Sequence, residues 1–126
     1  MALKRLDWKK TDPPHFDRVP ERAGIYIIST VQDADNEYEV KYVGQANNLR
    51  EHAKEHFSKK EQNKELKEHI DQKYMMKFNY SEVDSQSDRD GMELYMYELY
   101  APPFNHNTPP GETVISCTVP AAVKKR

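Results

Sequence analysis

Hydrophobic and polar positions follow two different periods along the chain, and these periods predict six elements. A two-residue period in β-branched and aromatic segments predicts three strands, over residues 24–30, 38–44 and 74–83. A 3.6-residue period or a capping residue predicts three helices, from Asn47 or Asn48 to about Ser58, over roughly 60–72, and from Ser85 or Ser87 to about Tyr100. The order strand, strand, helix, helix, strand, helix predicts an α/β (α+β) fold, in which helices flank a small three-stranded, largely antiparallel sheet.

The first and last predicted helices each have one face that suits a core. On the first helix, the i, i+3, i+4, i+7, i+8 spacing collects Leu49, His52, Ala53, His56 and Phe57. On the last helix, a core stripe contains Met92, Tyr95, Met96 and Leu99. Glu93 stands beside that stripe, so we expect its carboxylate at the edge of the core, where it needs a partner.

Proline-rich segments without a clear period flank these elements. We expect residues 1–20 to form an irregular lead-in, residues 21–106 to form one domain, and residues 107–126 to form a C-terminal tail with a short strand at 114–119. The chain has 126 residues, of which 37% are hydrophobic, and this is enough material for one modest core.

Cysteine content, hydropathy and charge narrow the expected setting. The one cysteine, Cys117, allows no internal disulfide and suggests a reducing compartment. The N-terminus does not resemble a signal peptide, and no segment approaches the roughly 20 apolar residues that cross a membrane. We therefore expect a soluble, intracellular, cytoplasmic protein. The net charge of -2 argues against strong stand-alone affinity for DNA, although a locally positive groove is compatible with it.

A small set of polar side chains could cleave a phosphodiester bond with the help of a metal. Such a reaction needs a carboxylate for the cation, a base for water, and a donor for the developing phosphate charge. The candidates are Tyr26 and Tyr42 on paired strands, the inward face of the first helix, and Glu93. Each feature is weak alone, because strand tyrosines are usually structural and a lone helix glutamate is usually solvated. His52 and His56, at positions i and i+4, offer an alternative zinc site.

The ordered combination is more specific than any of its parts. Gly24-Ile25-Tyr26 and Tyr42-Val43-Gly44 resemble the two signatures that name the GIY-YIG superfamily, which includes repair, homing and restriction endonucleases. The segment 45–49 resembles the short loop that enters the family's first helix. Three further residues stand at spacings similar to the family's, and they are Glu93, Pro102 and Asn105. The resemblance covers about residues 20–106.

The resemblance implies a divalent-metal-dependent endonuclease that hydrolyses DNA. Tyr26 and Tyr42 match the family tyrosines, one of which helps to activate or orient the attacking water. Glu93 matches the ligand of a single Mg²⁺ or Mn²⁺ ion, Asn105 matches a supporting residue, and His56 matches a frequent histidine of the first helix. Family nucleases often take their specificity from a second domain, and since none is seen in this sequence, a protein partner is a candidate source of specificity.

One position departs from the family pattern. Eight residues after Gly44 the family normally has an arginine that steadies the scissile phosphate, and this chain has His52. Arg50 lies roughly 200° away around the helix, so we expect it to point elsewhere. An imidazole cannot reproduce the bidentate guanidinium fork. The loss of one such phosphate donor costs on the order of 10²–10³ in rate.

Two alternatives to an active endonuclease stay open. The first is a catalytically weakened GIY-YIG module that binds nucleic acid or a protein partner without cutting, and His52 and the net charge favour it. The second is a small α/β interaction protein, in which Tyr26, Tyr42 and Glu93 are ordinary core and surface residues without a catalytic role. The endonuclease predicts that the hydroxyls of Tyr26 and Tyr42, both imidazoles of the first helix and the Glu93 carboxylate converge on one cleft. A position of Glu93 across the sheet from Tyr42 would contradict that cleft and, with it, the endonuclease interpretation.

Overall fold

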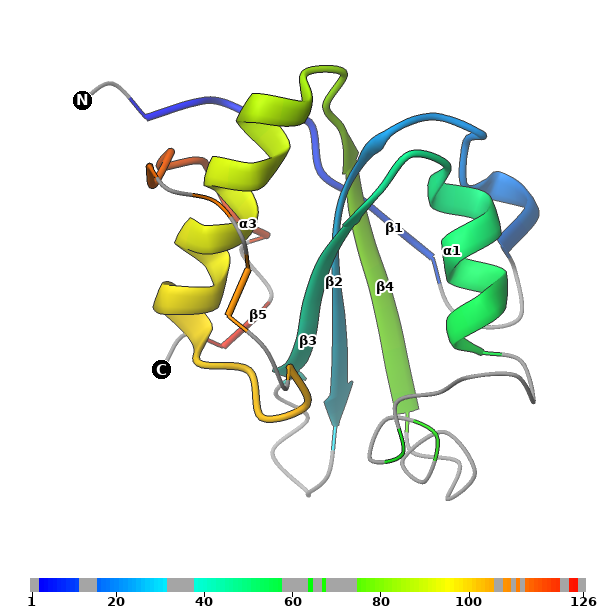
Figure 1. Ribbon diagram of the computed structural model, residues 1–126. Coiled ribbons are helices and arrows are strands. Elements are labelled where there is room, and N and C mark those ends of the chain that lie inside the picture. The colour runs from blue at the N-terminus through cyan, green and yellow to red at the C-terminus, as the bar shows by residue number, and fades with distance from the viewer. Residues whose placement is uncertain are drawn as a thin grey trace.

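The computed structural model describes residues 3–11, 16–31, 38–57, 64, 67, 75–105, 108–109, 111, 113–120 and 123–124. Figure 1 shows one sheet between two helices, with α1 (Leu49–His56) on one side and α3 (Gln86–Tyr100) on the other. A short 3₁₀ helix, η1 (Phe16–Arg18), lies in the lead-in. The α+β class that the periods predict is confirmed.

Three long antiparallel strands form the centre of the sheet, as predicted. β2 (Gly24–Val31) lies between β3 (Tyr38–Ala46) and β4 (Met75–Glu82). The predicted sheet is nevertheless too small, because two short strands extend it to the order β1-β4-β2-β3-β5. β1 (Lys9–Thr11) pairs with β4 antiparallel, and β5 (Val123–Lys124) pairs with β3 in parallel. Strands of three and two residues are too short to display a two-residue period.

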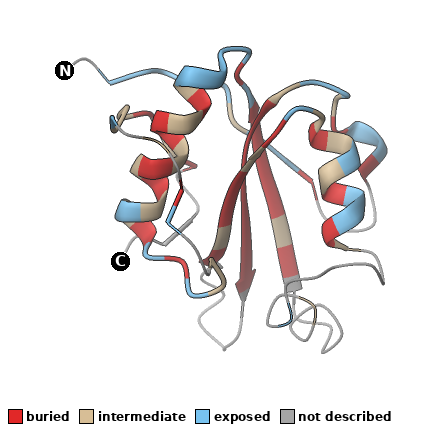
Figure 2. Ribbon diagram, viewed as in Figure 1, coloured by how far each residue is buried: buried red, intermediate tan, exposed pale blue. Residues whose placement is uncertain are grey.

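Alternation along β2 separates the core into two layers. Tyr26 and Ile28 belong to the layer on the α1 side, whereas Ile25 and Ile27 belong to the layer on the α3 side. Figure 2 shows that the central strands are buried on both faces and that each helix buries one side. Met96, from the predicted stripe of the last helix, is fully buried in the α3 layer. The sheet thus keeps side chains of successive residues on opposite sides of the molecule.

Both described α-helices begin at side-chain caps. The Asn48 side chain accepts a hydrogen bond from the Glu51 backbone N–H at the start of α1, and the Ser85 side chain accepts one from the Asp88 N–H at the start of α3. The second predicted helix, roughly 60–72, lies almost entirely outside the described residues. In the part of the chain that the structure describes, no helix has the length and hydrophobicity that crossing a bilayer requires.

The lead-in and the tail lie side by side. Lys4 forms an isolated parallel bridge with Cys117, through hydrogen bonds from Lys4 N to Ser116 O and from Thr118 N to Lys4 O. The strand expected at 114–119 is therefore present only as this bridge. Cys117 is buried in the α3 layer, so the tail covers part of the core.

Candidate active site

Two tyrosines and two histidines gather on the α1 side of the sheet. The Tyr26 hydroxyl oxygen lies 2.6 Å from Nε2 of His56 in a buried hydrogen bond. The Tyr42 ring lies 5.1 Å from the His56 ring and 6.2 Å from the Tyr26 ring, measured between centroids. The His52 ring lies 6.0 Å from the His56 ring. The structure therefore brings together four of the side chains that the sequence assigns to one cleft.

Close packing explains both signature glycines. A Cβ on Gly44 would lie 2.5 Å from the Tyr26 hydroxyl oxygen, so the phenol occupies the space that a side chain would need. A Cβ on Gly24 would collide with the carbonyl oxygen of Ser81, where β2 pairs with β4. The fold itself therefore requires glycine at both positions.

His52 lies on the site side of α1 and Arg50 does not, as predicted. The His52 ring lies 6.2 Å from the Tyr26 ring. Arg50 instead donates from Nε to the Val19 carbonyl oxygen at 2.7 Å, and from Nη2 to the Asp17 carbonyl oxygen at 3.1 Å. These bonds hold the guanidinium against the segment that leads into β2, so Arg50 does not serve the tyrosine cluster.

Glu93 lies on the opposite side of the sheet, and the expectation of a single cleft is wrong for this residue. Its Oε1 accepts a hydrogen bond of 3.0 Å from Gln45 Nε2. Because side chains alternate along β3, Gln45 faces α3, whereas Tyr42 packs against the α1 layer. A helical period fixes the angle of Glu93 around its own helix, but it does not say which face of the sheet that helix covers.

Two consecutive residues of β3 nevertheless hold the two parts of the site. The Tyr26 hydroxyl lies over Gly44, and the next residue, Gln45, binds Glu93. Consecutive Cα atoms are about 3.8 Å apart. The tyrosine cluster and the Gln45–Glu93 pair are therefore attached to neighbouring residues on opposite faces of the sheet, near the end of β3, where the chain turns into α1 (Figure 1).

Glu93 shares its amide donor with a second carboxylate. Gln45 Nε2 also donates to Asp90 Oδ1, at 2.7 Å. Burial raises the pKa of Glu93 above its ordinary 4.5, and although the hydrogen bond from Gln45 lowers this pKa, the charge of Asp90 raises it further. The net shift is upward, so the ionised form of Glu93 is costly unless a positive charge joins it.

The donors around Glu93 fit a hard divalent cation. Mg²⁺ keeps several of its waters and takes one or two carboxylates, which is what Glu93 and Asp90 offer. A cation would also offset the burial of Glu93 and its repulsion from Asp90. Zinc at His52 and His56 fits less well, because Nε2 of His56 is engaged by the Tyr26 hydroxyl. Within the described residues, no group of three His, Cys, Asp or Glu side chains is placed to hold a metal ion.

A buried arginine organises the end of β3. Arg89 is 4% exposed, and all five of its N–H groups are engaged inside the protein. Its acceptors are the carbonyl oxygens of Val83 and Asp84 and the side-chain oxygens of Gln45, Asn47 and Gln86. Because Arg89 holds the carbonyl end of the Gln45 amide, the nitrogen end faces Glu93. With every donor engaged, Arg89 does not replace the arginine that is missing at position 52.

Asn105 supports β3 from its outer edge. Its Oδ1 accepts a hydrogen bond from Val43 N at 2.9 Å, and its Nδ2 donates to Val43 O at 2.8 Å. The Phe104 N–H donates to Lys41 O at 2.9 Å on the same edge. The segment after α3 therefore acts as a neighbouring strand would, one residue before Gly44.

The paired tripeptides at the centre of this sheet, with their tyrosines in one cluster, define a GIY-YIG nuclease domain. The family model described as the GIY-YIG catalytic domain matches residues 22–107, well over half of the 126 residues. The protein therefore belongs to the GIY-YIG nuclease family. A search of curated proteins finds no match to the chain.

Sequence reasoning missed Gln45, Arg89 and Asp90. Charged and amide side chains next to a helix start are usually solvated, and nothing in the sequence marks Arg89 as buried. Asp90 had a usable feature, since it precedes Glu93 by three residues and the two carboxylates therefore share one side of the helix.

Proposed function

We propose that the protein is an endonuclease that uses a divalent metal ion to hydrolyse phosphodiester bonds in DNA. The observation that carries the proposal is the Glu93 carboxylate, which is half-buried beside Asp90 with a raised pKa. Its ionised form destabilises the fold. A destabilising group bound through Gln45, the residue after the signature Gly44, favours a function over packing. The geometry contradicts the single cleft from which the sequence predicted this activity, so the nuclease activity and the nucleic-acid substrate rest on membership of the family.

Tyr26 and His56 are assigned to the proton of the attacking water. The phenol oxygen and Nε2 are 2.6 Å apart, so the imidazole can accept the phenolic proton while the phenol oxygen takes one from water. Tyr42 borders this pair and fixes its position through ring contacts. His52, half-buried at the edge of the cluster, is assigned as a hydrogen-bond donor to the phosphate.

Mg²⁺ or Mn²⁺ is the proposed cofactor, and Glu93 is the residue proposed to hold it. When bound, it would supply positive charge for the phosphate oxygens. Asp90 adds a second carboxylate at the same amide, and Gln45 keeps both in place through hydrogen bonds of 2.7 and 3.0 Å. The role of the chain here is to orient these carboxylates and to limit their contact with water.

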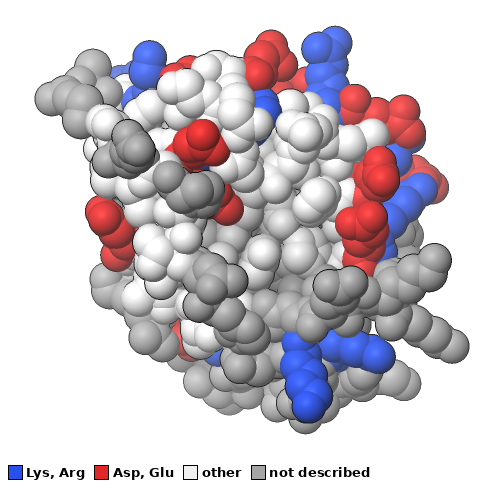
Figure 3. Space-filling model, in the orientation of Figure 1, with Lys and Arg blue, Asp and Glu red and all other residues white. Residues whose placement is uncertain are grey.

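The scissile phosphate is assigned to the end of β3, over Gly44 and Gln45. The Tyr26 hydroxyl packs over Gly44 on one face of the sheet, and the next residue, Gln45, binds Glu93 on the other face. Among the residues that Figure 3 colours, carboxylates lie over α3, carboxylates and basic side chains alternate over α1, and uncharged side chains lie between the two helices. Phosphate binding at this position therefore depends on few groups, of which His52 is one.

Cleavage of supercoiled plasmid tests the proposal. We expect nicking with Mg²⁺ or Mn²⁺ and none with EDTA, and we expect Glu93→Ala to abolish it. Glu98→Ala is the matched control, because Glu98 is an exposed carboxylate on the same helix. Nicking that persists in EDTA, or a Glu93→Ala protein as active as wild type, would refute the metal assignment.

Substitution of His52 tests the departure from the family pattern. His52→Arg restores a bidentate donor, so it should raise the cleavage rate at neutral pH by a factor on the order of ten or more. His52→Ala should remove cleavage while the denaturant midpoint stays close to that of wild type, because this side chain is only half-buried. A His52→Arg protein that cleaves more slowly than wild type would contradict the assigned role.

A binding module without cleavage is the second candidate, and His52 is the observation that favours it. This function predicts that wild type and His52→Arg are both inert toward single-stranded, duplex and branched DNA with either metal. It also predicts that Glu93→Ala leaves oligonucleotide binding unchanged. If both proteins fail to cleave DNA and Glu93→Ala still binds the oligonucleotide, the binding module is the correct function and the endonuclease is not.

A further inference from the structure

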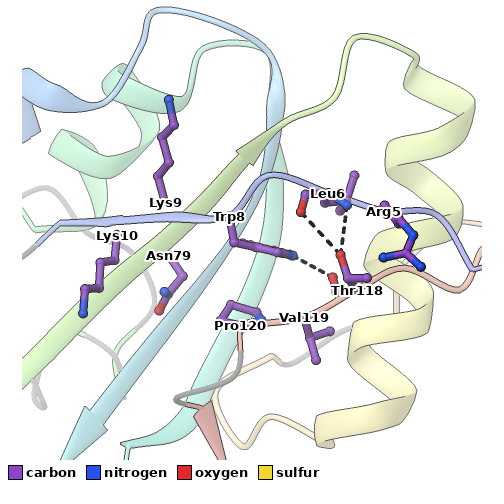
Figure 4. A pocket seen from close by; sticks show the side chains of 9 residues that line it. All are labelled: Arg5, Leu6, Trp8, Lys9, Lys10, Asn79, Thr118, Val119 and Pro120. Carbon is purple, nitrogen blue, oxygen red and sulfur yellow. Dashed lines mark hydrogen bonds between the residues drawn. The ribbon is translucent and has the colours of Figure 1, made fainter.

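A cavity of about 710 Å³ lies away from the tyrosine cluster, between the lead-in, the tail and β4. Figure 4 shows its lining, which consists of Arg5, Leu6, Trp8, Lys9, Lys10, Asn79, Thr118, Val119 and Pro120. All of these residues except Asn79 fall outside the segment 22–107 that matches the family model. The cavity is therefore an addition of this chain to the nuclease domain.

Hydrogen bonds between the lead-in and the tail build the wall of the cavity. Leu6 N donates to Thr118 Oγ1 at 2.9 Å, and Trp8 Nε1 donates to Thr118 O at 2.6 Å. On the other side, β1 pairs with β4 and places Lys10 opposite Asn79. Backbone pairing and the hydrogen bond of the Trp8 indole therefore fix the positions of the lining residues.

The charge of this region is opposite to that of the whole chain. Residues 3–11 carry Lys4, Arg5, Lys9 and Lys10 against the single carboxylate of Asp7, a net of +3, whereas the chain as a whole carries -2. The lining of the cavity includes three cations and no carboxylate. The lining would therefore attract a polyanion, although the chain as a whole carries a net negative charge.

The floor of the cavity offers groups that recognise a base. Trp8 is half-buried, and Figure 4 shows its indole reaching from the lead-in toward Thr118, with Pro120 and Asn79 beside it. Asn79 is 6% exposed, and its Oδ1 has no hydrogen-bond partner among the described residues. An unpaired buried acceptor is unfavourable, and because this oxygen has almost no exposed surface, the amide must turn about its Cβ–Cγ bond before a donor from a bound molecule can stabilise it.

We propose that this cavity binds a nucleotide of a single-stranded nucleic acid. Arg5 and Lys10 bind the backbone phosphates, Trp8 provides the surface against which the base stacks, and Asn79 accepts a hydrogen bond from the base. The inference shares a nucleic-acid ligand with the proposed function, but it concerns binding alone. It would give the nuclease a contact with its substrate apart from the end of β3.

Trp8 is the only tryptophan of the chain, so its fluorescence reports on this cavity directly. The experiment titrates the full chain in EDTA with an oligothymidylate of about ten nucleotides, a length within the usual site size. We expect a saturable change in Trp8 emission that inorganic phosphate alone does not produce. Lys10→Ala should weaken binding and lower the slope of log affinity against log salt by about 0.7. Lys54→Ala, which removes an exposed lysine from α1, should change neither.

A labelled oligothymidylate followed by anisotropy provides the second measurement. Trp8→Ala should weaken its binding on the order of ten-fold or more, whereas Trp8→Phe, which keeps an aromatic ring, should retain most of the affinity. Four results would overturn the proposal. Two come from the wild-type titration: no binding at all, or binding without a change in Trp8 emission. The others are the same emission change with phosphate alone, and equal losses of affinity for Lys10→Ala and Lys54→Ala. Because EDTA prevents metal-dependent cleavage, failure of the endonuclease proposal would not affect this result.

Discussion

Replacing Gly44 by alanine tests whether packing against Tyr26 fixes the second signature glycine. The new Cβ would lie 2.5 Å from the phenol oxygen and 2.6 Å from Cζ, where ordinary contacts are 3.4–4 Å. The ring would therefore have to move by about 1 Å. Tyr26 is only 2% exposed and is stacked on Phe78, at 5.2 Å between ring centroids, so the core resists this movement.

The expected cost has two parts. Overpacking a core costs about 1–3 kcal/mol. Displacing the phenol also lengthens the 2.6 Å bond to His56 and leaves two buried polar groups poorly paired, for about 1–3 kcal/mol more. A loss of about 2–6 kcal/mol is a large share of the roughly 5–15 kcal/mol that stabilises a small domain.

Denaturant unfolding of four proteins measures this effect. They are wild type, Gly44→Ala, Tyr26→Phe and the double variant. If the hydroxyl causes part of the clash, then Gly44→Ala should cost less in the Tyr26→Phe background, and the double-mutant cycle should show a coupling of about 0.5–3 kcal/mol. A Gly44→Ala protein as stable as wild type, or a cost that is the same in both backgrounds, would refute the packing explanation.

Three further predictions concern the other part of the site. Above the ordinary pKa of 4.5, stability should fall as pH rises through the raised pKa of Glu93, because the folded state holds the proton more tightly; Glu93→Gln should remove this fall. Mg²⁺ should raise the melting temperature of wild type, by the equivalent of about 2.7 kcal/mol at a hundred times Kd, and not that of Glu93→Gln. Arg89→Lys should lower the free energy of unfolding by about 2–4 kcal/mol in a denaturant titration, since lysine has at most three N–H donors for five acceptors. The first prediction fails if the stability of wild type does not depend on pH, and the second fails if Mg²⁺ raises the melting temperature of both proteins equally. The third fails if Arg89→Lys unfolds at the same denaturant midpoint as wild type.

Hydrophobic periodicity in the sequence predicts the longer strands and helices, but it does not predict features that depend on contacts between distant parts of the chain. The long strands and α1 follow from side-chain spacing, and Asn48 caps α1 as its side chain allows. β1 and β5 arise only because the ends of the chain reach open edges of the sheet. The side of the sheet on which Glu93 lies depends on the crossing of the chain after β4, which no local pattern encodes. Burial of Arg89 likewise depends on five acceptors that come from two separate segments, 45–47 and 83–86.

The residues that match the family signatures differ in how far the fold alone explains them. Gly24 and Gly44 are required by close contacts, Tyr26 fills the core, and Asn105 completes the edge of β3. A protein that had lost its activity would still keep these residues, because replacing them would destabilise it. Their presence therefore supports the fold more than the chemistry.

Glu93 is different, because the fold would be more stable without its charge. Burial and Asp90 both raise its pKa, and a neutral glutamine could keep a hydrogen bond to Gln45 without the cost of ionisation. Selection for stability alone would not favour a carboxylate there. Glu93, and not the tripeptides, is therefore the residue whose substitution separates an endonuclease from a binding module with the same fold.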